Sequence, residues 1–382
     1  MIPGDIGAEI VGLIATSAAK GELPAHAAGL GAAGTWRPAP ADAGGGPGTY
    51  ATSLPLALAR LAGRPAGQVA ALLASRLADL PWISAARVTG GGYLTITVTT
   101  LHLARLAGRI VAAGQAAAQS DALAGSRLAA PGLMDPGAAA SWAQTWRRHR
   151  DALTGRLARS AGADVVFFDS QQILSTASTR QATASSVPGA GTEAVGSWAG
   201  MAGHSGRVQV AVAYHGADAV RYALARTSAP KADLIGRQLA LPLDLANPFV
   251  AVRYAHADAA STLRWAASLG LAQDGRPGLD PTADELLPPE LALLDVMSWL
   301  AERVAAAARR RRPAELAAYL EHLAATWLDC NQACPALPFR GAAAPAVAAG
   351  TQAAARLGIA DAARTALACG LGLLGVSAPD RL

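Results

Sequence analysis

The sequence predicts a mainly helical protein with a small α+β domain at its N-terminal end and a bundle of helices at its C-terminal end. Apolar residues recur at helical spacing over much of the chain, and strand-like alternation is seen in residues 87–99. Pro-rich breaks divide residues 208–382 into helices. Hydrophobic residues make up 52% of the 382 residues and charged residues 15%, which excludes wholesale disorder.

Residues 1–113 are expected to form the first domain, since helical patterns there lead into an alternating segment that follows a Gly turn. The expected elements in chain order are a helix over 5–17, a Gly/Pro-rich loop over 37–49, helices over 53–63 and 65–80, and a strand-like segment over 87–99.

Residues 114–206 are expected to be a degenerate segment with little core of its own, because Ala, Gly and Ser dominate it around one helix, 141–161, and one apolar run, 165–168. Residues 207–382 are expected to form a bundle of four or five helices. This bundle should fold alone, because its helices supply their own apolar stripes.

A cytoplasmic protein without a membrane span or a metal site is expected. No run of about 18 apolar residues is free of Gly, Pro or polar residues, and Asp5 and Glu9 lie where a signal peptide needs positive charge. Cys330, Cys334 and Cys369 fit reduced thiols. No His or further Cys stands at zinc spacing around the first two.

The charge balance permits a nucleic-acid partner. The net charge is +5 and the pI about 9.4, with nearly all positive charge on Arg. A coding bias toward Arg, Ala and Gly explains the same composition equally well. The segment "GLGAAG", 29–34, matches a dinucleotide-binding pattern, but it lacks the strand before it and the helix after it that such a site needs.

An arginine cluster ends the helix that is expected from about Glu290 to just before Pro313. The cluster consists of Arg303, Arg309, Arg310, Arg311 and Arg312. Two interpretations stay open, because cations at this place either complement the C-terminal dipole of the helix or bind phosphates. The segment "WRRHR", 146–150, has the same ambiguity.

Several segments resemble motifs of the arginyl-tRNA synthetase family, in the family's order. "GADAVRYALARTS", 216–228, resembles the DALR signature that begins the family's anticodon-binding domain. "NPFVAVRYAHADAAS", 247–261, is similar to its helix NPxYYVQYAHAR, and "GLGLLGVSAPDRL", 370–382, to its ending GLxLLGVxAPERM. "WRP", "GTYATSLPLALARLAG" and "VTGGGYLTITV" resemble the N-terminal segments RP, GDYATNxALxLA and GPGFIN. The resemblance covers residues 1–113 and 208–382.

Between these two blocks the family carries a Rossmann-type catalytic core with HIGH and KMSK signatures, which binds ATP and arginine. Here residues 114–206 stand in its place. "MAGH", 201–204, keeps only the last Gly-His of HIGH, and "STASTR", 175–180, is faintly like the KMSK loop. The resemblance therefore implies no catalytic residues and no cofactor in this chain, with ATP needed only if aminoacylation survives.

Some residues depart from the family motifs. Arg253 replaces the Gln of the family helix and Asp258 its final Arg, while Leu382 replaces the terminal Met and Thr95 the Asn of GFIN. The family uses that helix and its C-terminal end around the anticodon. The resemblance therefore implies tRNA binding, with the N-terminal domain near the elbow of the tRNA and the bundle near its anticodon arm, without implying an arginine anticodon.

The helix that begins after Asn247 is expected to run to about Ser268, with Asn247 as the N-cap and Pro at the first helical position. Its buried stripe is expected to hold Phe249, Val252, His256, Ala259 and Leu263. Another face aligns Arg253, Ala257, Ala260 and Arg264, so that two guanidinium groups about 16 Å apart flank small residues. That face would admit a nucleic-acid backbone, and Tyr254 would stack on an unpaired base. A solvated face, with Tyr254 in a helix seam, is the alternative.

Two residue sets follow from this reasoning. The residues expected to bind tRNA are Arg253, Tyr254, Arg264, Arg303, Arg309, Arg310 and Arg311. The residues expected to hold the motifs in shape are Asp218, Arg221, Tyr222, Arg226, Asn247 and His256. Replacing both Arg253 and Arg264 by Ala would then reduce the salt dependence of tRNA binding.

Three functions remain compatible with the sequence. The first is an RNA-binding pseudoenzyme, a catalytically inactive relative of arginyl-tRNA synthetase that binds tRNA. The second is an arginine–tRNA ligase, or an enzyme of arginyl-tRNA-dependent biosynthesis, that needs a partner chain to supply the catalytic core. The third is a protein-interaction scaffold that has lost RNA binding.

Overall fold

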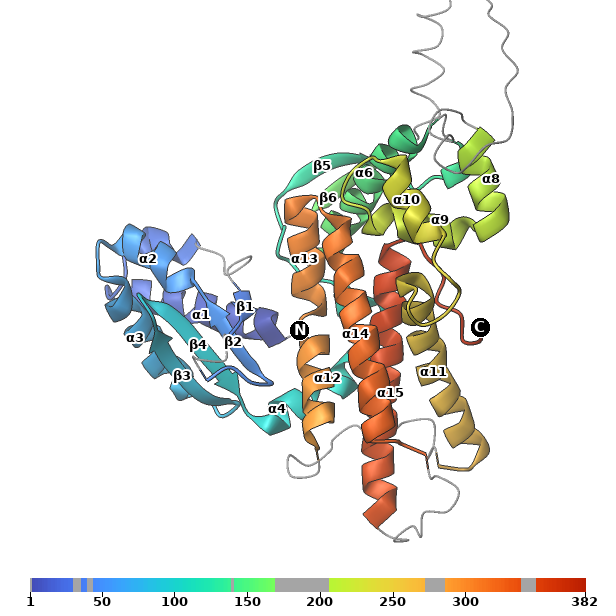
Figure 1. Ribbon diagram of the computed structural model, residues 1–382. Helices are drawn as coiled ribbons and strands as arrows, with labels where there is room; N and C mark the ends of the chain where they lie inside the picture. Colours follow the sequence, from blue (N-terminus) through green and yellow to red (C-terminus); the bar gives the residue numbers. More distant parts are fainter. Residues whose placement is uncertain are drawn as a thin grey trace, which may run out of the picture.

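The structure, a computed structural model, describes residues 2–29, 36–39, 44–138, 141–168, 206–271, 286–337 and 348–382. It is mainly helical, so the predicted fold class is confirmed. The long helices of the C-terminal part stand side by side, and a smaller unit of sheet and helices lies beside them (Figure 1).

The N-terminal unit is built on an antiparallel sheet with strand order β1-β2-β4-β3. The strands are β1 (Trp36–Pro38), β2 (Thr49–Thr52), β3 (Ile83–Thr89) and β4 (Tyr93–Val98). The helices of this part are α1 (Ile2–Ala19), the short η1 (Ala25–Gly29), α2 (Leu54–Ala62) and α3 (Ala66–Ala78), and α2 and α3 pack on the sheet. The three helical predictions are therefore confirmed.

The predicted alternating segment is the second half of a hairpin. In β4, Leu94, Ile96 and Val98 are buried because they face the helices, as period-2 alternation requires. The loop expected over 37–49 is wrong at both of its ends, which belong to β1 and β2. Strands of three and four residues among Gly and Pro carry too little periodicity to be recognised locally.

A polar joint connects the sheet to the C-terminal helices. The amide of Gly48 donates to Oδ1 of Asp295 at 2.9 Å, and the hydroxyl of Tyr50 donates to Oγ of Ser298 at 2.9 Å. The ring of Tyr50 also lies 5.3 Å from that of Trp299. These contacts reach α12 (Pro288–Ser298) and its C-terminal end, so they fix the N-terminal unit against the bundle.

Asp295→Asn is expected to stabilise this joint at neutral pH. Burial raises the pKa of Asp295 to about 6 from its ordinary value of 3.8, and the hydrogen bond from Gly48 only partly offsets this. The folded protein keeps a proton that the unfolded chain releases, so stability falls as the pH rises from about 4 to about 6. Asn retains the acceptor without the charge, so the variant should gain about 3 kcal/mol over the parent across this range. Urea unfolding of both proteins measures this, and a difference that does not change between about pH 4 and about pH 7 would contradict it.

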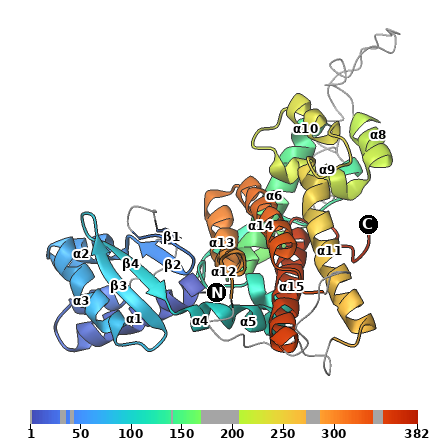
Figure 2. The same ribbon diagram turned by 60° about the horizontal axis from the view of Figure 1, so that its bottom comes forward.

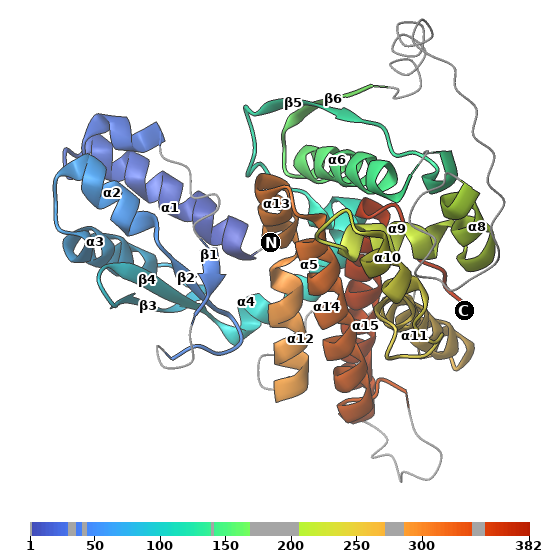
Figure 3. The ribbon, with the colours of Figure 1, turned by 45° about the horizontal axis from the view of Figure 1, so that its top comes forward.

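The middle of the chain contains a βαβ unit. Strand β5 (Arg127–Pro131) pairs in parallel with β6 (Asp164–Phe168), and α6 (Trp142–Ser160) connects them and covers one face (Figure 3). Gly155 permits this close packing, because a Cβ there would lie 2.3 Å from that of Ala130. The helix expected over 141–161 is confirmed, and Leu153 and Leu157 of α6 are fully buried in the apolar core that this unit shares with the C-terminal helices.

The C-terminal part has more helices than the four or five expected. They are α8 (Gly206–His215), α9 (Ala217–Arg226), α10 (Ala232–Leu239), α11 (Pro248–Ser268), α12, α13 (Leu300–Arg310), α14 (Pro313–Ala333) and α15 (Ala348–Leu373). The helix expected from Glu290 to Pro313 is two helices that meet at the buried Trp299. Apolar periodicity continues through this junction, which hides the break in the sequence.

The bundle is not closed by its own helices alone. Between the N-terminal sheet and β5 lie α4 (Thr100–Ala104), α5 (Leu106–Ala113) and the short η3 (Gly114–Ala118), and a further short helix, η4 (Pro136–Ala138), follows β5. α5 and η3 pack on α15, and α6 packs on α13 and α9 (Figure 2). The structure thus speaks against independent folding of residues 206–382, and the predicted boundaries at 113 and 206 stay predictions.

Within the described residues, one helix, α1, is long and apolar enough to cross a membrane. Its side chains Ile2, Ile6, Ile10 and Ile14 are fully buried within the N-terminal unit. The apolar character of α1 is therefore used in the core of this unit.

Candidate nucleic-acid interface

The start of α11 is fixed by Asn247. Its Oδ1 accepts a hydrogen bond from the amide of Phe249 at 3.1 Å, and its Nδ2 donates to the carbonyl of Pro242 at 3.1 Å. Pro248 occupies the first helical position, where a missing N–H costs nothing. The helix begins and ends where the sequence predicts.

One side of α11 packs on α14 and α15. Val252, His256 and Ala259 are buried there, as expected, while Phe249 and Leu263 are only partly buried. Nδ1 of His256 lies 3.0 Å from the carbonyl oxygen of Pro379. Burial lowers the pKa of His256, so its imidazole is neutral at pH 7 and serves packing.

The face of α11 that was expected to be open is partly covered. Ala257 is 8% exposed and Ala260 is 4% exposed, so no nucleic-acid backbone reaches them. The chain after α15 lies along this side, since Nη1 of Arg264 donates to the carbonyl of Asp380 at 2.7 Å. The expectation of an open small-residue groove is wrong, because the C-terminal segment, distant in sequence, occupies that side of the helix.

Arg253 lies where α11 approaches α9. Its guanidinium is 5.0 Å from the ring centre of Phe249, and its Nε is buried without a hydrogen-bond acceptor among the described residues. Its positive charge also helps to lower the pKa of Asp218. Arg253 is therefore more enclosed than a solvated phosphate-binding arginine would be.

Asp258 anchors α11 to α14. Its Oδ2 accepts hydrogen bonds from Nε1 of Trp327 at 3.1 Å and from Nδ2 of Asn331 at 2.9 Å. Burial raises the pKa of Asp258, although these two donors oppose the shift. Where the family motif has Arg, this chain uses a carboxylate as a structural acceptor.

The outward face of α11 carries two aromatic side chains. Tyr254 is 40% exposed and Trp265 is 61% exposed. They are separated by about three helical turns, so they point to the same side and their Cα atoms lie about 16 Å apart. Sequence reasoning missed Trp265, although its spacing from Tyr254 and its place outside the apolar stripe were a usable signal.

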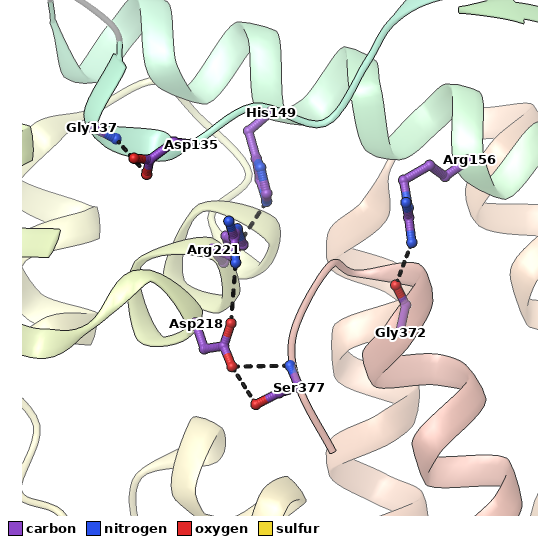
Figure 4. A network of polar contacts seen from close by, with 8 residues as sticks. All are labelled: Asp135, Gly137, His149, Arg156, Asp218, Arg221, Gly372 and Ser377. Atoms are coloured by element: carbon purple, nitrogen blue, oxygen red, sulfur yellow. Dashed lines mark hydrogen bonds and ion pairs between the residues drawn. The ribbon is translucent and has the colours of Figure 1, made fainter. Parts of the chain in front are cut away.

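The C-terminal segment is also fastened to α9. One carboxylate oxygen of Asp218 accepts hydrogen bonds from the amide of Ser377, at 3.0 Å, and from its hydroxyl, while the other faces Nη1 of Arg221 at 3.2 Å (Figure 4). Burial disfavours the ionised form of Asp218, but the bonds from Ser377 and the charges of Arg221 and Arg253 outweigh it and lower the pKa. This carboxylate is ionised and holds the segment in place.

The other end of α9 is tied to α14. Glu321 accepts a hydrogen bond from Nε of Arg226 at 2.7 Å and from the hydroxyl of Tyr222 at 3.2 Å. Nη1 of Arg226 donates to Oε1 of Gln238 at 2.9 Å, which adds α10. Tyr222 is buried, so its aromatic body also fills the space beside α11.

Helix α6 contacts both α9 and the end of α15. Nε2 of His149 lies 3.1 Å from the carbonyl oxygen of Arg221, and burial lowers the pKa of His149 to about 4. Two turns further along α6, Nη2 of Arg156 donates to the carbonyl of Gly372 at 2.6 Å (Figure 4). The middle unit thus supports the helices that carry the α11 face.

Most of the arginine cluster on α13 serves ion pairs. Nη2 of Arg309 lies 2.6 Å from Glu302, and Nη1 of Arg310 lies 3.0 Å from Glu315. Arg303 is 5.4 Å from the ring centre of Trp299. Arg311 ends the helix in a left-handed conformation, with φ of 53°. It is exposed, and the part of the chain that the structure describes gives it no ion-pair partner. α14 and α15 separate this cluster from α11 (Figure 1).

The sheet of the N-terminal unit presents a second polar surface. One row of direct cross-strand partners runs over all four strands, so the side chains of the row share one face of the sheet. The row consists of Arg37 on β1, Ala51 on β2, Thr95 on β4 and Arg87 on β3. Both arginines are exposed at the two sides of this row. Arg37 also lies 4.0 Å above the ring of Tyr93.

Residues 252–382 match the DALR anticodon binding domain. The C-terminal part of this chain is a DALR domain. It is 40% identical over 176 residues to the arginine–tRNA ligase of Frankia alni, a match that covers 44% of this chain and 29% of that protein. The arginine–tRNA ligase of Kineococcus radiotolerans is 38% identical over 170 residues, with the same coverage. The matched segment thus spans under a third of the length of these curated relatives.

The fold resembles that of Thermus thermophilus arginyl-tRNA synthetase. The TM-score is 0.55 at 15% sequence identity, and the match covers 98% of this chain. This likeness is one of fold, and the sequence similarity to the arginine–tRNA ligases is carried by the matches above. The DALR domain holds α11 from Val252 onward, so Arg253, Tyr254 and Arg264 all belong to it.

Proposed function

We propose that the protein binds tRNA and does not activate arginine on its own. The observation that carries this proposal is the exposed pair Tyr254 and Trp265 on the outward face of α11, inside the DALR domain. Proteins commonly hold single-stranded RNA by stacking its bases on aromatic side chains. The distance of about 16 Å between Tyr254 and Trp265 corresponds to about three nucleotides of such a strand. The pair is therefore suited to an anticodon loop.

A second contact is proposed at the N-terminal sheet. Arg37 and Arg87 are two exposed cations three strand spacings apart, or about 14 Å, on either side of the buried Ala51 and Thr95. Guanidinium groups bind phosphate oxygens with good geometry. Because the joint through Asp295 and Tyr50 fixes this unit against the bundle, both contacts would engage one folded RNA.

The βαβ unit supports the proposal that the protein does not activate arginine on its own. Amino-acid activation needs donors around a triphosphate and an acidic pocket for the arginine guanidinium. The described part of residues 114–206 forms one βαβ unit, in which Asp151 faces Arg150 and Asp164 faces Arg127. These carboxylates are already used by arginines of the chain.

Purified protein is expected to show no arginine-dependent exchange between ATP and pyrophosphate, because the described part of residues 114–206 offers one βαβ unit where activation needs a site for both ATP and arginine. The measurement uses radiolabelled pyrophosphate with a no-enzyme blank and a sample from cells that do not express the protein. Arginine-dependent exchange above both controls would refute this half of the proposal.

A ligase that works with a partner chain is the second candidate. It is favoured by the outer face of β5 and β6, where Val166 and Phe168 are exposed on a parallel sheet whose other face is covered by α6. Parallel sheets are ordinarily covered on both faces. Exchange activity that appears only when the protein is purified with a stoichiometric partner would select this candidate.

A further inference from the structure

A cavity of about 490 Å³ lies where the βαβ unit meets the C-terminal end of α15, away from the outward face of α11. It is lined by residues of η3, the loop after β5, α6, β6 and α15. A volume between about 300 and 1,000 Å³ is typical of small-molecule sites. The polar side chains that are available to an anion are Arg156 and Arg159 of α6, Gln115 of η3, and Gln119, which directly follows η3.

Among the described residues, Arg156 has no carboxylate that pairs with it. Its Nε donates to the carbonyl of Leu373 at 3.2 Å and its Nη2 to that of Gly372 at 2.6 Å, which satisfies the exposed carbonyls at the end of α15. Both protons of Nη1 are left without an acceptor among the described residues. Burial lowers the pKa of Arg156, as expected for a cation with only partial charge opposite it.

Arg159, one turn further along α6, adds a second cation that has no ion pair with any residue that the structure describes. Its Nη2 donates to the carbonyl of Val165 at 2.7 Å, and its guanidinium lies 4.1 Å from the ring centre of Phe167. These contacts orient the side chain but leave Nε and Nη1 available. Of the described residues that line the cavity, none is Asp or Glu.

The other walls are apolar. Leu133, Leu373 and the ring of Phe167 contribute carbon surface to the cavity. An inorganic anion would pair with the guanidinium groups but would leave this carbon surface exposed to water. An organic molecule with one anionic end would also cover the carbon surface, and the burial of that surface would add to the free energy of binding.

We propose that this cavity binds a small organic anion whose phosphate or carboxylate group pairs with Arg156 and Arg159, while its organic part lies against Leu133, Leu373 and Phe167. Guanidinium pairs bind both oxyanions in the same fork geometry, so the two groups are alternatives of one chemistry. The side chains of Gln115 and Gln119 provide further hydrogen bonds at the walls and the mouth. The site is independent of RNA binding by α11.

The test is isothermal titration of the full chain with glucose 6-phosphate, citrate and inorganic phosphate. At least one of the two organic anions is expected to bind saturably with one site per chain, and tighter than inorganic phosphate. Comparison of glucose 6-phosphate with citrate shows whether the site prefers a phosphate group or a carboxylate group. No saturable binding of either up to about 5 mM, or inorganic phosphate binding as tightly as both, overturns the proposal.

The variants are Arg159→Gln and, as the matched control, Arg147→Gln. Arg147 is exposed on the same helix and does not line the cavity, so both variants remove one positive charge from α6. Arg159→Gln is expected to weaken binding about tenfold, or about 1.4 kcal/mol, and Arg147→Gln less than about twofold. Gln119→Glu, at the exposed mouth, tests the site without touching either cavity arginine and should also weaken binding. Equal effects of the two arginine variants, or no effect of Gln119→Glu, would assign the binding to general surface charge and overturn the site.

Discussion

Replacing Tyr254 and Trp265 together by alanine is expected to weaken tRNA binding about 100-fold at constant salt. Stacking of one base on an aromatic side chain contributes about 1–3 kcal/mol, and the two rings are far enough apart to hold different bases. Both side chains point away from the core, so the thermal unfolding midpoint of the variant should stay close to that of the parent. Fluorescence anisotropy with labelled tRNA gives the affinities.

The matched control for this pair is Tyr214→Ala. Tyr214 is 80% exposed and lies on α8, which packs on α9 and not on the outward face of α11. It should leave the affinity within about twofold of the parent. If the control weakens binding as much as the double variant, or if the double variant binds like the parent, α11 is not the RNA-binding face.

The fragment of residues 206–382 is expected not to unfold cooperatively. Leu106 and Ile110 of α5 and Leu153 and Leu157 of α6 are fully buried in the same apolar core as α13, α14 and α15. Removing side chains of this kind forfeits about 1.5–3 kcal/mol each, a sum comparable to the whole stability of a domain. The fragment would expose the opposite surfaces of the bundle helices.

Residues 100–382 form the comparison fragment, because they keep α4, α5, the βαβ unit and the bundle. This longer fragment should give a single cooperative thermal transition with native-like helicity. A cooperative transition in the shorter fragment, at a midpoint near that of the longer one, would show that the C-terminal helices close their own core.

What the sequence predicts well is local. The first turn of α11 is specified by Asn247 and Pro248, whose cap and fixed backbone act over three residues, and the structure agrees with the predicted helix at both ends. α1, α2 and α3 are likewise identified by their own apolar periodicity. The matched DALR domain confirms, over residues 252–382, the resemblance that was carried by short ordered motifs.

What it misses depends on contacts between distant residues. A helical wheel separates the side of α11 that holds Ala257 and Ala260 from the apolar stripe, but it does not show that the segment around Pro379 and Asp380 lies along that side. β1 exists because it pairs with β2, and β2 because it pairs with both β1 and β4, and no local pattern encodes this pairing. The carboxylates of Glu302 and Glu315 similarly decide the role of Arg309 and Arg310 through pairing.

These contacts also change what the arginines of α11 are expected to do. Replacing Arg253 and Arg264 by alanine was expected to remove two phosphate contacts from an open face. Arg264 holds the carbonyl of Asp380, and Arg253 lies against Phe249 beside the Asp218 network, so the double variant would also loosen the C-terminal segment. The exposed aromatic pair is the cleaner probe of the same helix.

The most direct test of the account is a titration of labelled tRNA with the full chain from about 50 to about 200 mM salt. We predict saturable binding whose log affinity falls linearly with log salt. The slope should be about −2 or steeper, as expected when two or more arginines neutralise phosphates of the RNA. No tRNA binding at the low-salt end would contradict the account and leave a protein-interaction scaffold as the function of this fold.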